Sequence, residues 1–162
     1  MTATRADDFL NALVAKAVGL QATTLAGVTV LDGPWPAGAT VTDPDFLIIG
    51  GDYEPTSFDQ PAVTTIPTAS PMGNNSFDEA LTVPGVAVSW RGDPNAMTTC
   101  RAVAIGTVEA FQDGLTADPT LGGLLEDQAL LSVVGLRQVQ TTRGPYCAVN
   151  FTVSATALIW NG

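Results

Sequence analysis

Residues 86–123, VAVSWRGDPNAMTTCRAVAIGTVEAFQDGLTADPTLGG, decide the fold expected of this chain. Apolar side chains recur within them at intervals of three or four: Met97, Cys100, Ala104, Val108, Phe111 and Leu115. Because successive helical residues turn by about 100°, these side chains form one narrow stripe of a helix. The other side carries polar residues such as Glu109 and Asp113, so we expect the stripe to face a core.

The ends of this helix carry start and stop signals. Asp93 can accept hydrogen bonds from the first turn, and Pro94 suits a first helical position because its missing N–H had no partner there. Gly114 and the Thr116-Ala117 step indicate the end of the helix. Asp-Pro at 118–119 repeats the start signal and predicts a short second helix that ends at Gly122.

The chain before this stretch predicts one helix and three strands. Apolar spacing from Phe9 to Val18 indicates the helix, with a capping box at Thr4 and a stop at Gly19. The strands are expected near 28–30, at 46–49 in the sheet interior, and at 77–91. Pro84 lies inside the third strand and cannot donate to a ladder, which predicts a sheet edge or a bulge there.

The chain after this stretch predicts a C-terminal β-hairpin, with strands at 133–142 and from 146 onward. The last strand alternates cleanly, and its apolar side is Cys147, Val149, Phe151, Val153, Ala155, Ala157 and Ile159. Tyr146, Ala148 and Trp160 fall on the polar side, which makes Trp160 a candidate contact with a partner. We therefore predict one α+β domain over 1–162, with an antiparallel or mixed β-sheet and helices packed on one face.

Charge is distributed unevenly along the chain. The chain has sixteen acidic and six basic residues, and the segment between Ala17 and Trp90 has eight acids and no Lys or Arg. Nucleic-acid binding needs a basic footprint, so specific DNA binding is not expected. An acidic surface suits a passage through which DNA slides, or it simply keeps the protein soluble. The candidates for an acidic surface or lumen are Asp43, Asp45, Asp52 and Asp59.

The residue types present argue against an enzyme. The chain has no histidine, which removes Ser-His-Asp and Cys-His arrangements and most metal sites. It has no phosphate-binding Gly-Lys-Ser/Thr loop. Cys100 and Cys147 are expected to be reduced core thiols near each other. We expect no catalytic residue, no cofactor and no metal.

Residues 51–75 are predicted to be a long loop with four prolines, which is unusual inside a compact domain. It would suit an arm laid on another subunit, or it is an insertion without a role. Trp35, between two prolines, is either a packed lid or an anchor for a neighbouring subunit. The candidate subunit or partner contacts are Tyr53, Glu54, Phe58, Val63, Ile66, Trp35 and Trp160.

No window is long and apolar enough to span a membrane, and the N-terminal residues lack the layout of a signal peptide. We therefore expect a protein that stays in the cytoplasm or leaves the cell inside a particle.

The second half of the chain resembles the tail terminator, or tail completion, proteins of long, flexible-tailed bacteriophages, especially those that infect actinobacteria. The resemblance covers about residues 76–160. It is carried by DEALTV at 78–83, VSWRGD at 88–93, VEAF at 108–111, ADPTLGG at 117–123, QVQT at 138–141 and VNFTV at 149–153.

This resemblance implies a homohexameric ring at the head-proximal end of the tail tube. The ring would end tube growth and join the tail to the head. Its partners would be other copies, the tail tube protein and the head–tail connector or stopper, while DNA passes through without specific binding. The protein would be assembled in the host cytoplasm and end in the virion. One alternative is a connector or stopper in the neck. Another is a small acid-rich hydrolase or carbohydrate-binding module that uses Trp35, Trp90 and Trp160.

Overall fold

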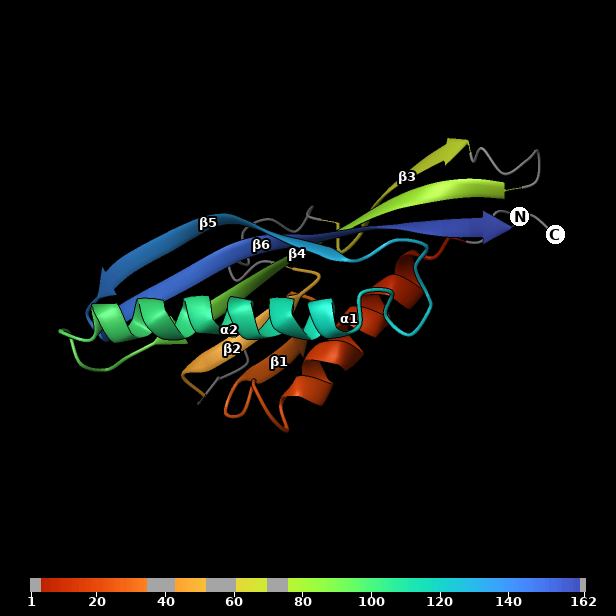
Figure 1. The fold of residues 1–162 in the computed structure, drawn as a ribbon. Coiled ribbons are helices and arrows are strands. Elements are labelled where there is room, and N and C mark those ends of the chain that lie inside the picture. Colours follow the sequence, from red (N-terminus) through yellow and green to blue (C-terminus); the bar gives the residue numbers. More distant parts are fainter. Residues whose placement is uncertain (1–3, 35–42, 52–60, 70–75, 161–162) are drawn as a thin grey trace.

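The computed structural model describes residues 4–34, 43–51, 61–69 and 76–160. Its elements follow the order α1 (Ala6–Leu20), β1 (Thr29–Asp32), β2 (Asp45–Ile49), β3 (Thr64–Ala69), β4 (Ser76–Trp90), α2 (Met97–Ala117), β5 (Leu130–Thr141) and β6 (Gly144–Trp160). The predicted α+β fold is confirmed. The described residues form a mixed six-stranded sheet with two helices, and β5 and β6 form the C-terminal hairpin (Figure 1).

The antiparallel pair of β4 and β6 is the centre of the sheet. It holds fifteen residue pairs, from Ser76 opposite Trp160 to Trp90 opposite Tyr146. The strand order is β1-β2-β4-β6-β5, with β1 parallel to β2 and the remaining pairs antiparallel. The other edge of β4 is shared, since residues 77–82 pair with β3 and residues 85–89 pair with β2.

Pro84 lies at the point where β4 passes from β3 to β2. The prediction of a sheet edge or a bulge at Pro84 is wrong, because β4 is an interior strand whose register with β6 is continuous. The carbonyl of Pro84 accepts a hydrogen bond from the Gly50 N–H at 2.8 Å, on the β2 side. In an antiparallel strand the nitrogen and the carbonyl of one residue point to the same side. The Pro84 nitrogen, which carries no hydrogen, therefore points away from β6, towards the gap between β3 and β2. The ladder with β6 therefore loses no bond.

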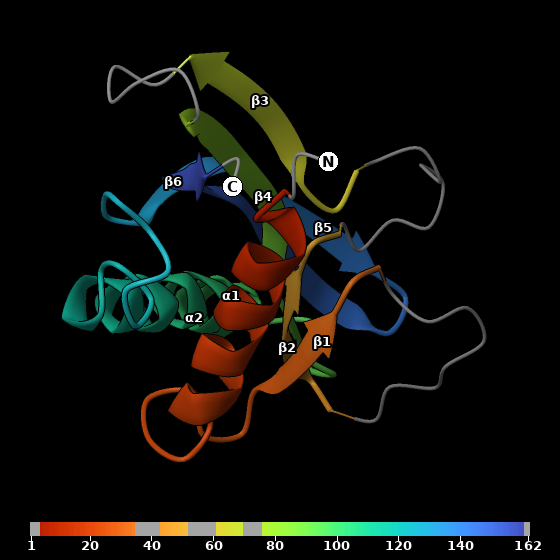
Figure 2. The ribbon, with the colours of Figure 1, turned by 90° about the vertical axis from the view of Figure 1, so that its right-hand side faces the viewer.

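Both helices cover one face of the sheet, and the larger core lies between them and the strands (Figure 2). The predicted α2 stripe is confirmed, because its residues from Cys100 to Leu115 are buried and Met97 packs against them. All seven apolar residues predicted on the inward side of β6 are buried as well. The rings of Phe111 and Phe151 meet at a centroid distance of 6.0 Å, which joins the helix to the centre of the sheet.

A second, smaller buried cluster lies on the opposite face of the sheet. It contains Phe46, Ile48, Val86, Val88, Tyr146 and Ala148, with Leu31 and Trp90 packed against it. The sequence places Tyr146 and Ala148 on the polar side of β6, and the expectation that this side is polar throughout is wrong here. Interior strands can be apolar on both faces. The rings of Trp90 and Tyr146 lie 5.4 Å apart in this cluster.

Helix α1 begins differently from the prediction. The Thr4 hydroxyl donates to the Glu79 carboxylate at 2.6 Å instead of forming a capping box with Asp7. The other Glu79 oxygen accepts from the Arg5 N–H at 2.8 Å. A buried carboxylate on β4 thus meets the N-terminus of α1, where the helix dipole favours negative charge. Gly19, predicted as a stop, lies inside the helix.

Helix α2 begins at Met97, three residues later than Pro94 predicts, because Asp93 accepts instead from the Asn95 N–H in a local turn. The short helix predicted after Asp118 is replaced by turns. Leu121, Gly122 and Gly123 have φ values of 49°, 71° and 88°, which a right-handed helix excludes.

Part of the predicted loop at 51–75 is a strand. Residues 64–69 form β3, which pairs with β4 from Thr64 opposite Thr82 to Ala69 opposite Phe77. The prediction of an uninterrupted loop is therefore wrong for residues 64–69. Pro67 lies on a strand that pairs only with β4 in the described chain. Residues 52–60 and 70–75 lie outside the described residues.

Gly85 lets the Phe151 ring lie against the backbone of β4. A Cβ there would lie 2.4 Å from Cζ of Phe151 and 2.9 Å from the Ile48 carbonyl. We expect Gly85→Ala to lower the free energy of unfolding by about 1–3 kcal/mol through overpacking. The matched control is Gly106→Ala on α2, where no described atom lies within 4 Å of the added Cβ. This control should raise stability by roughly 0.5–1 kcal/mol. Urea unfolding checks both, and a neutral Gly85→Ala would contradict the packing described here.

Candidate interaction surface

Strand β5 exposes an unusual amount of apolar surface. Of the eight large hydrophobic residues exposed in the described chain, five lie on this strand: Leu130, Val133, Val134, Leu136 and Val139. Val133 is 60% exposed and Val134 is 68% exposed. In the described part of the chain, β5 pairs only with β6 and forms one end of the strand order. Contiguous exposed apolar surface on an edge strand is typical of a protein–protein contact.

The exposed apolar side chains of β5 lie on both faces of the sheet along its outer edge. Val133 and Leu136 lie opposite Phe151 and Val149, which places them on the helix side of the sheet. Leu130 lies opposite Ser154 and therefore points to the other face, as does Val139. Val134 lies at a bulge, where the register skips from 133 to 135.

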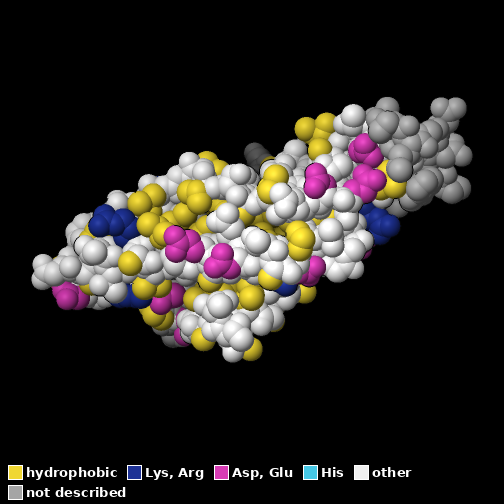
Figure 3. All heavy atoms as spheres, in the orientation of Figure 1, with side chains coloured by type: hydrophobic (Ala, Val, Ile, Leu, Met, Phe, Trp, Pro, Cys, Tyr) yellow, Lys and Arg dark blue, Asp and Glu magenta, His cyan; other side chains and the backbone are white. Residues whose placement is uncertain are grey.

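Ile105 on α2 is also exposed, and it lies one helical turn after Arg101, whose guanidinium donates to Gln138 of β5. We call Leu130, Val133, Val134, Leu136, Val139 and Ile105 the β5 surface. Figure 3 shows hydrophobic side chains gathered over β5 and beside α2, at the left of the molecule.

The contact residues predicted from sequence are scattered or lie outside the described chain. Val63 packs against the helix-side core, and Ile66 is 60% exposed on β3. Trp160 pairs with Ser76 at the end of β6. Tyr53, Glu54, Phe58 and Trp35 lie outside the described residues, as do Asp52 and Asp59.

Sequence reasoning missed β5 as a surface. The available signal was the run from Leu130 to Val134, which is apolar at positions of both parities and therefore does not fit a strand with one buried face.

The two described candidates for an acidic surface differ in their environments. Asp45 binds the Arg91 guanidinium through both oxygens, at 2.8 and 3.2 Å, and accepts from the Ser89 hydroxyl at 2.7 Å. The hydrogen bonds between Arg91 and Asp45 raise the pKa of Arg91 above its ordinary value. Asp43 is exposed and accepts from the Thr29 hydroxyl. Asp45 therefore serves to hold the end of β4 rather than to present an open charge.

Replacing Asp45 should cost more stability than replacing Asp43. Asp45→Ala leaves the half-buried Arg91 and the fully buried Ser89 without this partner, so we expect a loss of about 1.5–3 kcal/mol. Asp43→Ala should change the free energy of unfolding by no more than about 0.5 kcal/mol. Chemical denaturation of both variants measures the difference, and equal losses would refute the assigned role of Asp45.

The two cysteines are buried and form no disulfide, as predicted. The Cys100 thiol donates to the Ser89 carbonyl at 2.8 Å, and Ser89 lies directly opposite Cys147. The Cys147 sulfur lies 3.6 Å from the Met97 sulfur. Burial, with a smaller contribution from the neighbouring Cys100, raises the pKa of Cys147 to about 11. Cys147 is thus a neutral core side chain at physiological pH rather than a nucleophile.

This raised pKa makes stability depend on alkaline pH. The folded thiol holds its proton more tightly than the unfolded thiol, whose pKa is about 8.5, so stability is lost as the pH rises from there toward about 11. Cys147→Ala should reduce this loss of Tm. Val149→Ala, a truncation on the same strand without a titrating group, should keep it. Thermal unfolding of the wild type and both variants at neutral and alkaline pH checks this prediction. An equal pH dependence of Tm in all three proteins would contradict the role given to Cys147.

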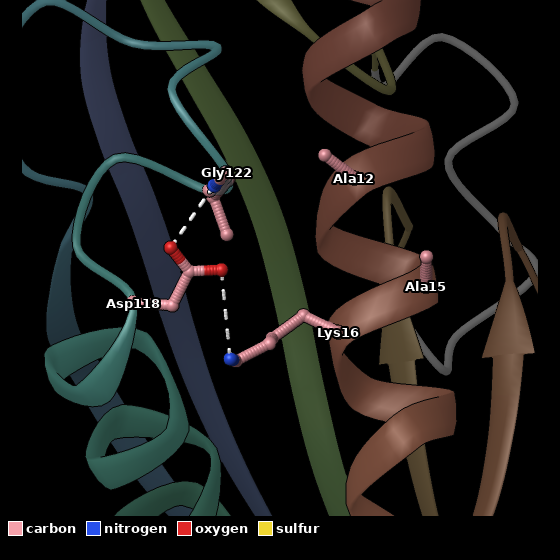
Figure 4. Close-up of a pocket in the computed structure, with 6 residues that line it drawn as sticks. Ala12, Ala15, Lys16, Asp118 and Gly122 are labelled. Carbon is pink, nitrogen blue, oxygen red and sulfur yellow. Dashed lines mark hydrogen bonds and ion pairs between the residues drawn. The ribbon is translucent and has the colours of Figure 1, made fainter.

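A shallow pocket lies between α1 and the turn that follows α2 (Figure 4). It is lined by Ala12, Ala15, Lys16, Asp118, Leu121 and Gly122. The Lys16 ammonium lies 3.7 Å from one Asp118 oxygen, and the other oxygen accepts from the Gly122 N–H at 2.9 Å. Its charged groups are therefore paired with each other, and the pocket ties α1 to this turn.

Within the described segments, no group of three or more His, Cys, Asp or Glu residues is arranged to hold a metal ion. None of the helices in those segments is both long and apolar enough to cross a membrane. No protein-family model matches this chain, and no curated protein is significantly similar to it. The β5 surface is the feature with the clearest functional implication.

Proposed function

We propose that this protein is a structural component of a long-tailed phage virion. It forms a ring at the head-proximal end of the tail tube, ends tube polymerisation and joins the tail to the head connector. The proposal starts from the resemblance of residues 76–160 to tail terminator proteins. The structural observation that supports it is the exposed apolar edge of β5.

This edge favours a role in assembly. Sheet edges in monomeric proteins are usually protected by charges, prolines or covering segments. On β5 the exposed positions include three valines and two leucines, and Arg137 is the one charged residue of the strand. Burial of such side chains is worth about 25 cal/mol per Å² of apolar area, so a protein partner that covers them gains free energy. Binding rather than catalysis is then the mechanism.

The charge balance is compatible with a passage for DNA. The chain has a formal net charge of −10, which repels the phosphate backbone and disfavours adhesion. A ring also needs a contact in which one patch of a copy fits a different patch of the next, since a self-complementary contact stops at two copies.

Tail length in a phage that cannot make this protein tests the proposal. We expect tails of abnormal, uncontrolled length by electron microscopy, because nothing would stop tube growth. Expression of the wild-type chain in trans should restore the normal length. Tails of normal length that fail to join filled heads would instead identify a connector or stopper. Normal infectious particles would exclude a role in the neck and favour a binding module.

A further inference from the structure

We infer that a second copy of this chain covers the β5 surface, docked head to tail with its acidic end. This inference rests on the proposed ring and names the contact that builds it. The acidic end is defined by Asp7, Asp8, Asp78, Glu126 and Asp127, together with β3.

Basic side chains flank the β5 surface. Arg137 lies on β5 opposite Ala148, and Arg143 lies in the turn between β5 and β6. Arg101 on α2 donates to the side chain of Gln138 at 3.2 Å, which places it beside the same strand. The other three bases of the chain each form an ion pair with an acid: Arg5 with Asp8, Lys16 with Asp118 and Arg91 with Asp45. Half of the basic residues are therefore gathered near the apolar surface.

Acidic side chains gather at the other end of the long strands. Asp7 and Asp8 lie in the first turn of α1, which is joined to β4 through Glu79. Asp78 precedes that glutamate on β4. The Glu126 N–H donates to the Thr156 carbonyl at 3.3 Å, which places residues 126–127 beside the last part of β6.

Figure 3 shows acidic side chains near the β3 and β4 end with a basic group beside them, and both basic and acidic side chains at the opposite end, beside α2 and β5. The acidic end also offers an apolar contact, because β3 exposes Ile66 and pairs with β4 alone in the described chain. It can therefore supply both charge and apolar area to the β5 surface of a neighbour.

The basic residues of the β5 surface and the acidic end lie towards opposite ends of the β4–β6 pair (Figure 1). Val139 lies opposite Tyr146 at one end and Asp78 lies opposite Leu158 at the other, while Leu130, opposite Ser154, is the part of the β5 surface nearest the acidic end. A contact between opposite ends is heterologous, so it adds copies until the rotation closes a ring.

Native mass spectrometry of the full chain, with light scattering over a range of concentrations, tests this contact. The wild-type chain should form a closed oligomer of more than two copies. Val134→Glu should weaken association at least tenfold, because it places a charge in the apolar surface. Val18→Glu is the matched control, since Val18 is an exposed valine on α1, away from β5, and this variant should assemble normally. Circular dichroism verifies that both variants are folded.

Charge reversal tests the second half of the contact without altering the apolar residues. Arg101→Glu with Arg143→Glu should weaken assembly, and so should Asp78→Lys with Asp127→Lys. A chain that carries all four substitutions should recover assembly, because the complementarity is restored with its signs exchanged.

Several outcomes would overturn the inference. Rings that persist in Val134→Glu would place the subunit contact elsewhere and leave the proposed function intact. A two-fold dimer would contradict both head-to-tail docking and the ring. A wild-type chain that stays monomeric at high concentration would exclude self-association through β5. Tail length in the phage would still test the proposed function separately in that case.

Discussion

The continuous register between β4 and β6 is the constraint on which the rest of the structure depends. Both residues of a pair point to the same face of the sheet, and successive pairs point alternately to the helix side and to the other side. A slip by one residue would turn Phe151 away from Phe111 and would turn Glu79 away from the start of α1. Beside this pair, β3 lies along residues 77–82 of β4 and β5 lies along residues 144–154 of β6, so the two outer strands flank different parts of it.

Local patterns in the sequence were sufficient to predict the α2 stripe, the inward residues of β6 and the α+β class. Each depends on a period within one segment. The capping of α1 by Glu79 could not be predicted in this way, because the two groups lie 74 residues apart in sequence. The turn at 121–123 shows a local signal that was overridden, since its positive φ values prevent the helix that Asp118 suggests. β3 was missed because its proline and three threonines are typical of a loop.

The candidate site was harder to predict than the fold, because exposure depends on which neighbours the topology supplies. Val133 and Leu136 share the inward face of the sheet with buried residues of β6, yet they remain exposed at its margin. Nothing in the composition of β5 indicates that it ends the strand order. The net charge likewise does not show that three of the six basic residues, Arg101, Arg137 and Arg143, lie on or beside β5.

The outer edge of β5 is proposed to become a protein interface. Hydrogen exchange of the backbone amides of β5 tests this directly, in the assembled chain and in chain dissociated by dilution. We expect the amides of residues 130–139 to exchange more slowly in the assembly, while those of the exposed side of α1 around Val18 remain unchanged. Equal exchange at β5 in both states would contradict it.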